Sequence, residues 1–285
     1  MDRVSTHSCP ATESKPLPAS WVDPLSAATT SHHQRKKSSS GAGKKDRGLA
    51  RQKRNSWMRS SIVRRAATVV DEEVEALCEK SPFLNSTYAI SAAPDVALFH
   101  RLEITLGERL GKGGFAEVFQ VTGLDIDDDE TNDEAEQKKR ALRRQCQATI
   151  QSAPSGHPTF AVKFIKKKLL KNTREFQHAA IDLAVEAKYL AALSHPNIIK
   201  MRGMTVGGTS AFRAGKHDDF FILMDQMQET LDRRIQSWKR CQEEQEQQTR
   251  KQRWSPALHY EMSMKYALQI ADALAYLHER AIVYR

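Results

Sequence analysis

A short glycine-rich stretch places the strongest constraint on how this chain can fold. Glycines occupy three of the four positions from 111 to 114. Apolar and polar residues alternate on both sides, over 102–110 and 115–121, and a period of two is typical of strands. The glycines therefore predict the turn of a hairpin. Glycine can adopt positive φ and bring its N–H groups close to an anion, so a flap over phosphates and an ordinary hairpin are both open interpretations.

The composition indicates a soluble protein with enough apolar material for a core, since 40% of the residues are hydrophobic and 28% are charged. No apolar run approaches the roughly 18 residues of a transmembrane helix, and the N-terminus lacks the apolar segment of a secretory signal. The four cysteines are widely scattered, which indicates a reducing compartment. We therefore expect a cytoplasmic or nuclear protein without a transmembrane segment.

The net charge of +9 is concentrated in one segment of the chain. Residues 31–65 contain twelve Lys or Arg and one Asp, whereas the remainder is nearly neutral. Residues 1–95 are expected to form a disordered, basic, Ser-rich tail with one short helix near 68–80. Residues 35–65 are interpreted as a solvated linker, or as a patch for nuclear import or for contact with an anionic surface. Specific nucleic-acid binding is not predicted.

The rest of the chain alternates between strand and helix patterns, so the predicted fold class is α+β. Besides the hairpin, strands are expected at 159–165, 198–206 and 220–224, and helices at 175–193, near 230–238 and at 256–279. Residues 122–158 and 239–254 are interpreted as surface insertions that are disordered or partly helical. The acidic stretch 125–136 lacks the glycine that a calcium loop requires at its sixth position, and no metal site is predicted.

One lysine stands within an otherwise apolar strand. Strand alternation places Lys163 on the same face as Ala161. An edge lysine that reaches solvent would explain it, and so would a cation held in a cleft. The helix that follows carries Glu186, which taken alone would be a solvated charge.

In combination, these motifs resemble the eukaryotic protein kinase family over roughly residues 99–285. The motifs occur in the family's order: the glycine-rich hairpin, Ala161-Val162-Lys163, a helix with Glu186, His195-Pro196-Asn197-Ile198, Met224-Asp225 at a strand end, and a helix leading to Ile282-Val283-Tyr284-Arg285. The resemblance implies a small lobe over 96–227, built from an antiparallel five-stranded sheet and one regulatory helix. The start of a helical large lobe would follow over 228–285.

The resemblance also implies a role for each matching position. Lys163 would hold the α- and β-phosphates of ATP and pair with Glu186, and these two are the predicted catalytic residues. Val118 and Ala161 would sandwich the adenine, with Met224 at the back of its pocket. Asp225 and Met227 would offer hinge backbone groups to the adenine edge. The loop covering the phosphates would comprise Leu110, Gly111, Lys112, Gly113, Gly114, Phe115 and Ala116, where Ala116 replaces the family's third glycine.

The chain departs from the family at its end, because Arg285 stands where the catalytic Asp should follow. We expect the chain as written to bind ATP without transferring phosphate, as the N-terminal fragment of a Ser/Thr protein kinase whose Mg²⁺ ligands lie in the missing part. The alternative is a non-catalytic nucleotide-binding or pseudokinase-like adaptor module. A dinucleotide-binding enzyme would require a helix after the glycines, whereas residues 115–121 alternate like a strand.

Overall fold

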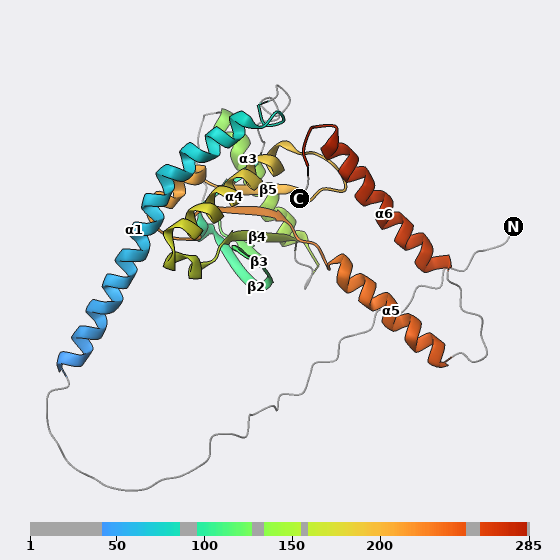
Figure 1. The fold of residues 1–285 in the computed structure, drawn as a ribbon, viewed down its shortest axis with the longest axis horizontal. Helices are drawn as coiled ribbons and strands as arrows, with labels where there is room; N and C mark the ends of the chain where they lie inside the picture. Colours follow the sequence, from blue (N-terminus) through green and yellow to red (C-terminus); the bar gives the residue numbers. More distant parts are fainter. Residues whose placement is uncertain (1–41, 86–95, 127–133, 155–158, 249–256, 284–285) are drawn as a thin grey trace, which may run out of the picture. The chain divides into compact units, whose positions relative to one another are not determined.

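A six-stranded sheet forms the centre of the computed structural model, which describes residues 42–85, 96–126, 134–154, 159–248 and 257–283 (Figure 1). The strand order is β1-β5-β6-β4-β3-β2. The strands are β1 (Ala97–Phe99), β2 (Ile104–Lys112), β3 (Ala116–Leu124), β4 (Phe160–Ile165), β5 (Met201–Thr205) and β6 (Phe221–Asp225). Neighbours are antiparallel except β1 and β5, which are parallel. The predicted α+β class is confirmed.

The sheet has one strand more than the five expected. The additional strand, β1, is three residues long and pairs Ala97 with Gly203 of β5. Three residues are too few for an alternation of apolar and polar residues to be recognised in the sequence. The predicted hairpin is present as β2 and β3, and the continuously apolar strand β6 lies inside the sheet with Phe221, Ile222 and Leu223 fully buried.

Helices surround the sheet, together with the 3₁₀ turns η1 (Arg101–Glu103), η2 (Lys167–Lys171) and η3 (Gly208–Ala214). The helices are α1 (Ala42–Lys80), α3 (Glu134–Ser152), α4 (Thr173–Ala192), α5 (Leu231–Gln248) and α6 (Ala257–His278). The side chain of Asn172 accepts hydrogen bonds from the N–H groups of Arg174 and Glu175, which caps α4. Among the described residues no helix is long and apolar enough to cross a membrane.

The two faces of the sheet are covered by different helices. On β4, Ala161 and Ile165 belong to an apolar cluster shared with α4 and α1. Phe160 and Val162 alternate to the opposite face and join a second cluster with Cys146 of α3. The strand is therefore buried on both sides, which explains why it is apolar at almost every position.

The insertion predicted at 122–158 contains regular secondary structure in its described part. β3 continues to Leu124, and α3 packs on the sheet through an ion pair between Arg143 and Glu103, with the two side-chain atoms 2.6 Å apart. The side chain of Gln147 donates to the carbonyl oxygen of Leu124 at 3.0 Å. The second insertion continues α5 as far as Gln248.

The disorder predicted for the N-terminal region is wrong between residues 42 and 67, whereas the helix predicted near 68–80 is present as the last part of α1. Instead of a short helix near 68–80 after a disordered segment, α1 spans 39 residues. Its Val63 and Val70 are fully buried in the cluster that includes α4, so the apolar core begins well before residue 96. Tertiary packing of this stripe stabilises a helix that local periodicity does not reveal. The tail predicted for residues 1–41 and the helix start at Ser255-Pro256 lie outside the described residues.

Candidate nucleotide-binding site

Lys163 and Glu186, which are 23 positions apart in the chain, meet in the structure. The Lys163 ammonium donates to both carboxylate oxygens of Glu186, with Nζ 2.7 Å from Oε1 and 2.5 Å from Oε2. The Lys163 side chain is 25% exposed and that of Glu186 is 37% exposed. The pair is therefore half-buried, and solvent still reaches the cation.

The elements that position this pair are the central strand β4 and the helix α4. Lys163 lies opposite Val118 of β3 and opposite Ile222 of β6. Because β4 has a partner strand on both sides, its backbone is fixed, and the strand pleat directs Lys163 to the face covered by α4. The lysine is thus neither at a sheet edge nor fully solvated.

Three apolar residues expected around an adenine ring lie together beside Lys163. Ala161 lies two residues before it, on the same face of β4, and pairs with Met224 across β6. Ala161 is 4% exposed and Met224 is 8% exposed, while Val118 is partly buried against the same cluster. They form a continuous apolar surface next to the ammonium group.

The glycines of the hairpin occupy a turn with open space where side chains would stand. The N–H of Gly113 donates to the carbonyl oxygen of Ala116 at 3.0 Å, which closes the turn. A Cβ on Gly111 would meet its nearest described neighbour at 3.9 Å and one on Gly113 at 3.6 Å, both ordinary contacts, and a Cβ on Gly114 would meet none within 4 Å. Packing does not require glycine at these three positions.

Other glycines of the sheet are required by packing. A Cβ on Gly107 would lie 2.6 Å from Thr122, and one on Gly203 would lie 2.8 Å from the carbonyl oxygen of Ala97. Positive φ, which the sequence suggested for the hairpin, is found among described glycines at 207, 208 and 215 instead. The property that glycine gives the hairpin is therefore an uncovered backbone, which suits the close approach of a ligand.

A buried lysine directly after β4, which the sequence analysis did not single out, contacts the tip of the hairpin. Lys166 is 3% exposed, and its ammonium donates to the carbonyl oxygens of Gly113 and Gly114. Its backbone N–H donates to the carbonyl oxygen of Phe115 at 3.0 Å. The only signal for this contact in the sequence is that Lys166 ends an apolar strand.

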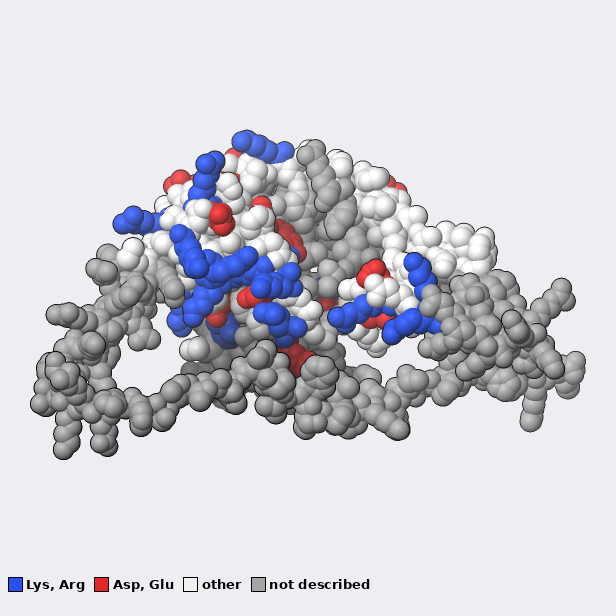
Figure 2. Space-filling view, turned by 60° about the horizontal axis from the view of Figure 1, so that its bottom comes forward, with Lys and Arg blue, Asp and Glu red and all other residues white. Residues whose placement is uncertain are grey.

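The surroundings of the hairpin are strongly cationic. Desolvation lowers the pKa of Lys166 from its ordinary value, and the nearby cations Lys168, Lys112 and Arg109 lower it further. Figure 2 shows Lys and Arg side chains gathered on the face in view. Such a field favours the approach of an anion.

The other residues predicted to contact ATP lie in different surroundings: Asp225, Leu110, Phe115 and Met227. The N–H of Asp225 donates to the carbonyl oxygen of Lys200 at 3.1 Å, so this N–H group is engaged within the protein. Leu110 is 43% exposed, Phe115 49% and Met227 58%. These three apolar side chains are exposed and so available to a ligand. They do not pack in one cluster with Lys163 in the described structure.

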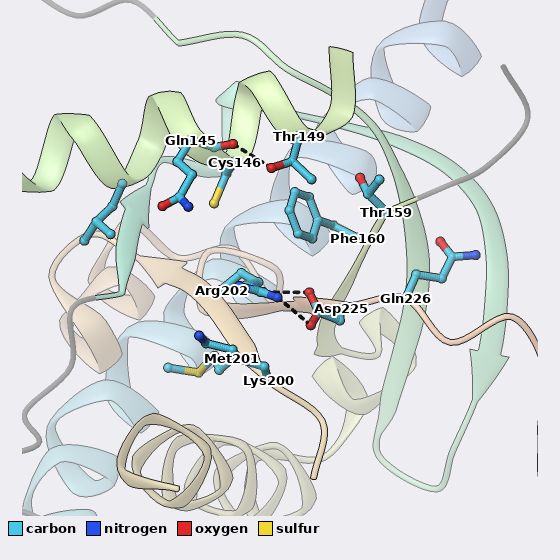
Figure 3. Close-up of a pocket in the computed structure, with 11 residues that line it drawn as sticks. Gln145, Cys146, Thr149, Thr159, Phe160, Lys200, Met201, Arg202, Asp225 and Gln226 are labelled. Carbon is cyan, nitrogen blue, oxygen red and sulfur yellow. Dashed lines mark hydrogen bonds and ion pairs between the residues drawn. The ribbon is translucent and has the colours of Figure 1, made fainter. Parts of the chain in front are cut away.

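The Asp225 side chain belongs to a cavity on the opposite face of the sheet (Figure 3). It receives two hydrogen bonds from the guanidinium of Arg202, at 2.7 and 2.9 Å. The cavity has a volume of about 450 Å³, and α3 lines one side of it. Cys146 of α3 lines it as well, and burial is the main cause that raises the pKa of its thiol. Lys163 does not line it, and it is separate from the candidate site.

A second cavity, of about 650 Å³, lies between α6 and residues 196–199, next to Met227. The His-Pro-Asn motif at 195–197 holds α6 beside this cavity. The His195 and Tyr276 ring centroids lie 4.7 Å apart, and the Asn197 side chain donates to the Asp272 carboxylate at 2.8 Å. The His-Pro-Asn motif therefore joins the sheet to the helical part that follows.

A metal ion would need several ligating side chains close together among the described residues. No group of three or more His, Cys, Asp or Glu side chains among them could hold one. The Mg²⁺ implied by the family resemblance does not fit these residues by themselves.

Comparison with known proteins agrees with the geometry. Residues 148–285 match the family model for the protein kinase domain. This range contains Lys163, Glu186 and Met224 and begins after the β2–β3 hairpin. A search of curated proteins gave no match. The match over residues 148–285, together with the mixed α+β fold, supports membership of the eukaryotic protein kinase family for this part of the chain.

Proposed function

We propose that the chain binds ATP between the β2–β3 hairpin and the face of β4, as the nucleotide-binding part of a protein kinase of the Ser/Thr type. One observation carries the proposal. Lys163, on the strand next to the hairpin, pairs with Glu186 of α4. ATP would supply the phosphoryl group that such an enzyme transfers to a protein substrate.

Lys163 would neutralise the α- and β-phosphates. Its ammonium is a compact charge with three donors, and two of them point to Glu186 in the structure. The carboxylate fixes the amine in place, so the entropy of a flexible side chain is lost before the ligand arrives. The 25% exposure of Lys163 leaves a path for a phosphate.

The hairpin would cover the phosphates with its backbone. The open space at Gly111, Gly113 and Gly114 lets backbone N–H groups approach an anion that side chains would otherwise exclude. Lys112 and Phe115 lie exposed on either side of this turn. Lys166 holds the carbonyl oxygens of the turn, and this contact keeps the tip in one arrangement.

The adenine would lie on the apolar surface of Val118, Ala161 and Met224. These side chains are already packed, so the surface is present before a ligand binds. Leu110 would add a second apolar contact from the end of β2. The hinge would contribute the Asp225 carbonyl and the Met227 backbone, since the N–H of Asp225 is engaged by Lys200.

Titration of the full chain with a fluorescent ATP analogue, followed by displacement with unlabelled ATP, tests the proposal. We expect one saturable site from which ATP displaces the analogue and from which inorganic phosphate alone does not. Analogue binding that ATP cannot displace would contradict an ATP site, and so would an absence of saturable binding.

A further inference from the structure

The second half of α1 and the residues after it pack on α4, the helix that carries Glu186. Figure 1 shows α1 passing beside α4. Five apolar residues with the helical spacing i, i+3, i+4, i+7 and i+11 line one side of α1, and they share a cluster with Phe176 and Ala180 of α4: Val63, Ala66, Ala67, Val70 and Val74. The first four are 0% exposed and Val74 is 5% exposed. This stripe is the buried face of an amphipathic helix.

Polar contacts fix the same helix to the turn η3. Asp71 accepts a hydrogen bond from the Thr209 hydroxyl, and its carboxylate lies 3.6 Å from the guanidinium of Arg213. Gly215 has φ +93°, and a Cβ there would lie 2.1 Å from the Ser60 hydroxyl oxygen. Such a close approach of backbone to helix requires one specific placement of α1 on the lobe.

The segment that follows α1 contacts α4 close to Glu186. The Ser81 hydroxyl lies 2.9 Å from the Tyr189 hydroxyl, and the Phe83 ring stacks on the Tyr189 ring with centroids 6.0 Å apart. Phe83 is 4% exposed and packs in a cluster with Ala192 at the end of α4. Tyr189 is three positions after Glu186, so the two are neighbours on the helix surface.

The Lys163–Glu186 pair cannot hold α4 in place by itself. Ion pairs that solvent reaches contribute little to stability, because solvation competes with them. A stripe of five buried side chains removes far more apolar surface from water. The position of α4 therefore depends on what packs against it from outside the sheet.

We propose that residues 58–85 form a positioning element that holds α4 so that Glu186 engages Lys163. The proposal rests on the function proposed for the pair. In this arrangement nucleotide affinity depends on residues that touch neither the nucleotide nor the pair. Val70, Phe83 and Tyr189 are positioning residues that act through Glu186.

The test combines two docking variants with Glu186→Gln in the full chain. Val70→Asp places a charge in the buried stripe, and Phe83→Ala removes the stacking on Tyr189. We expect each to weaken binding of the fluorescent ATP analogue about fivefold or more, as is typical of coupled sites. In the Glu186→Gln background neither should weaken it further, because the group through which they act is already absent. Equal losses in both backgrounds would overturn the proposal.

Leu77→Asp is the matched control, since Leu77 lies on the same helix and is 45% exposed. It should leave affinity unchanged. Phe83→Ala, outside α1, keeps the test valid if Val70→Asp does not fold, as judged by thermal unfolding. Tyr189→Phe keeps the stacked ring and should retain most of the affinity that Tyr189→Ala loses.

Hydrogen exchange separates this inference from the proposed function. Amides of α4 around Glu186 should exchange faster in Phe83→Ala than in the unaltered chain and in Leu77→Asp. If Lys163→Met leaves nucleotide affinity unchanged, the proposed function fails, and the exchange result still decides whether α1 holds α4. Unchanged α4 protection in both docking variants would overturn the positioning role.

Discussion

Replacement of Lys163 by Met is the perturbation whose outcome follows most directly from the structure. Methionine retains most of the length and apolar surface of the side chain and removes the ammonium that contacts Glu186. The strand should stay in place, because Lys163 lies between two partner strands and its neighbours in β4 are buried. The change therefore removes a charge without removing the surrounding surface.

The size of the effect can be bounded from the geometry. Hydrogen bonds to charged groups contribute about 1.5–3 kcal/mol, and the 25% exposure of Lys163 favours the lower half of that range. Since 1.4 kcal/mol is a tenfold change in affinity, the ATP analogue should bind about 10- to 40-fold more weakly. Glu186→Gln should weaken binding of the analogue less than Lys163→Met does, because the Lys163 ammonium remains and loses only its ion pair with Glu186.

The assay is equilibrium titration with the fluorescent ATP analogue at fixed ionic strength. Lys171→Met is the control, since it removes the same charge from an exposed position on η2 and should change affinity less than twofold. Equal losses in the two variants would show that general electrostatic attraction accounts for binding. Unchanged affinity in Lys163→Met would refute the role of the pair.

Three further predictions concern the glycines, one histidine and the basic segment. Gly114→Ala should leave the urea midpoint unchanged and weaken nucleotide binding, whereas Gly203→Ala should destabilise the chain by about 1–3 kcal/mol, because its Cβ would lie 2.7 Å from Phe99. Burial is the main cause that lowers the pKa of His217 below 6.5, with Lys167 and Arg101 lowering it further and Asp218 and Glu117 opposing them. The unfolded chain therefore binds this proton more readily, so the thermal midpoint should fall as the pH drops below about 6.5, and His217→Gln should flatten that dependence. If residues 35–65 serve nuclear import, alanine at Lys44, Lys45, Lys53 and Arg54 should move a fluorescent fusion from nucleus to cytoplasm, and an unchanged distribution would contradict an import role.

Much of the sheet and of the candidate site could be predicted from sequence because each depends on local pattern. Alternation around the glycines identified β2 and β3, and the apolar run at 220–224 identified an inner strand. The pairing of Lys163 with Glu186 was implied by the resemblance to the protein kinase family. The strands could be predicted from the sequence because strand and helix periods are properties of neighbouring residues.

The features that were missed depend on contacts between distant segments. The buried stripe of α1 is stabilised by α4 and η3, which lie more than 100 positions later in the chain. Lys166 is buried because hairpin carbonyl groups lie within reach of its ammonium, and a run of lysines gives no hint of that. The turn between β2 and β3 closes without left-handed residues, so the positive φ that glycine can adopt is not used there.

An experimental structure of the full chain with a non-hydrolysable ATP analogue tests the central claim most directly. The account predicts the α- and β-phosphates against the Lys163 ammonium, beneath the backbone of residues 111–116, with the adenine on Ala161 and Met224. A nucleotide bound elsewhere, such as in the cavity beneath α3 beside Arg202, with Lys163 still paired only with Glu186, would contradict it.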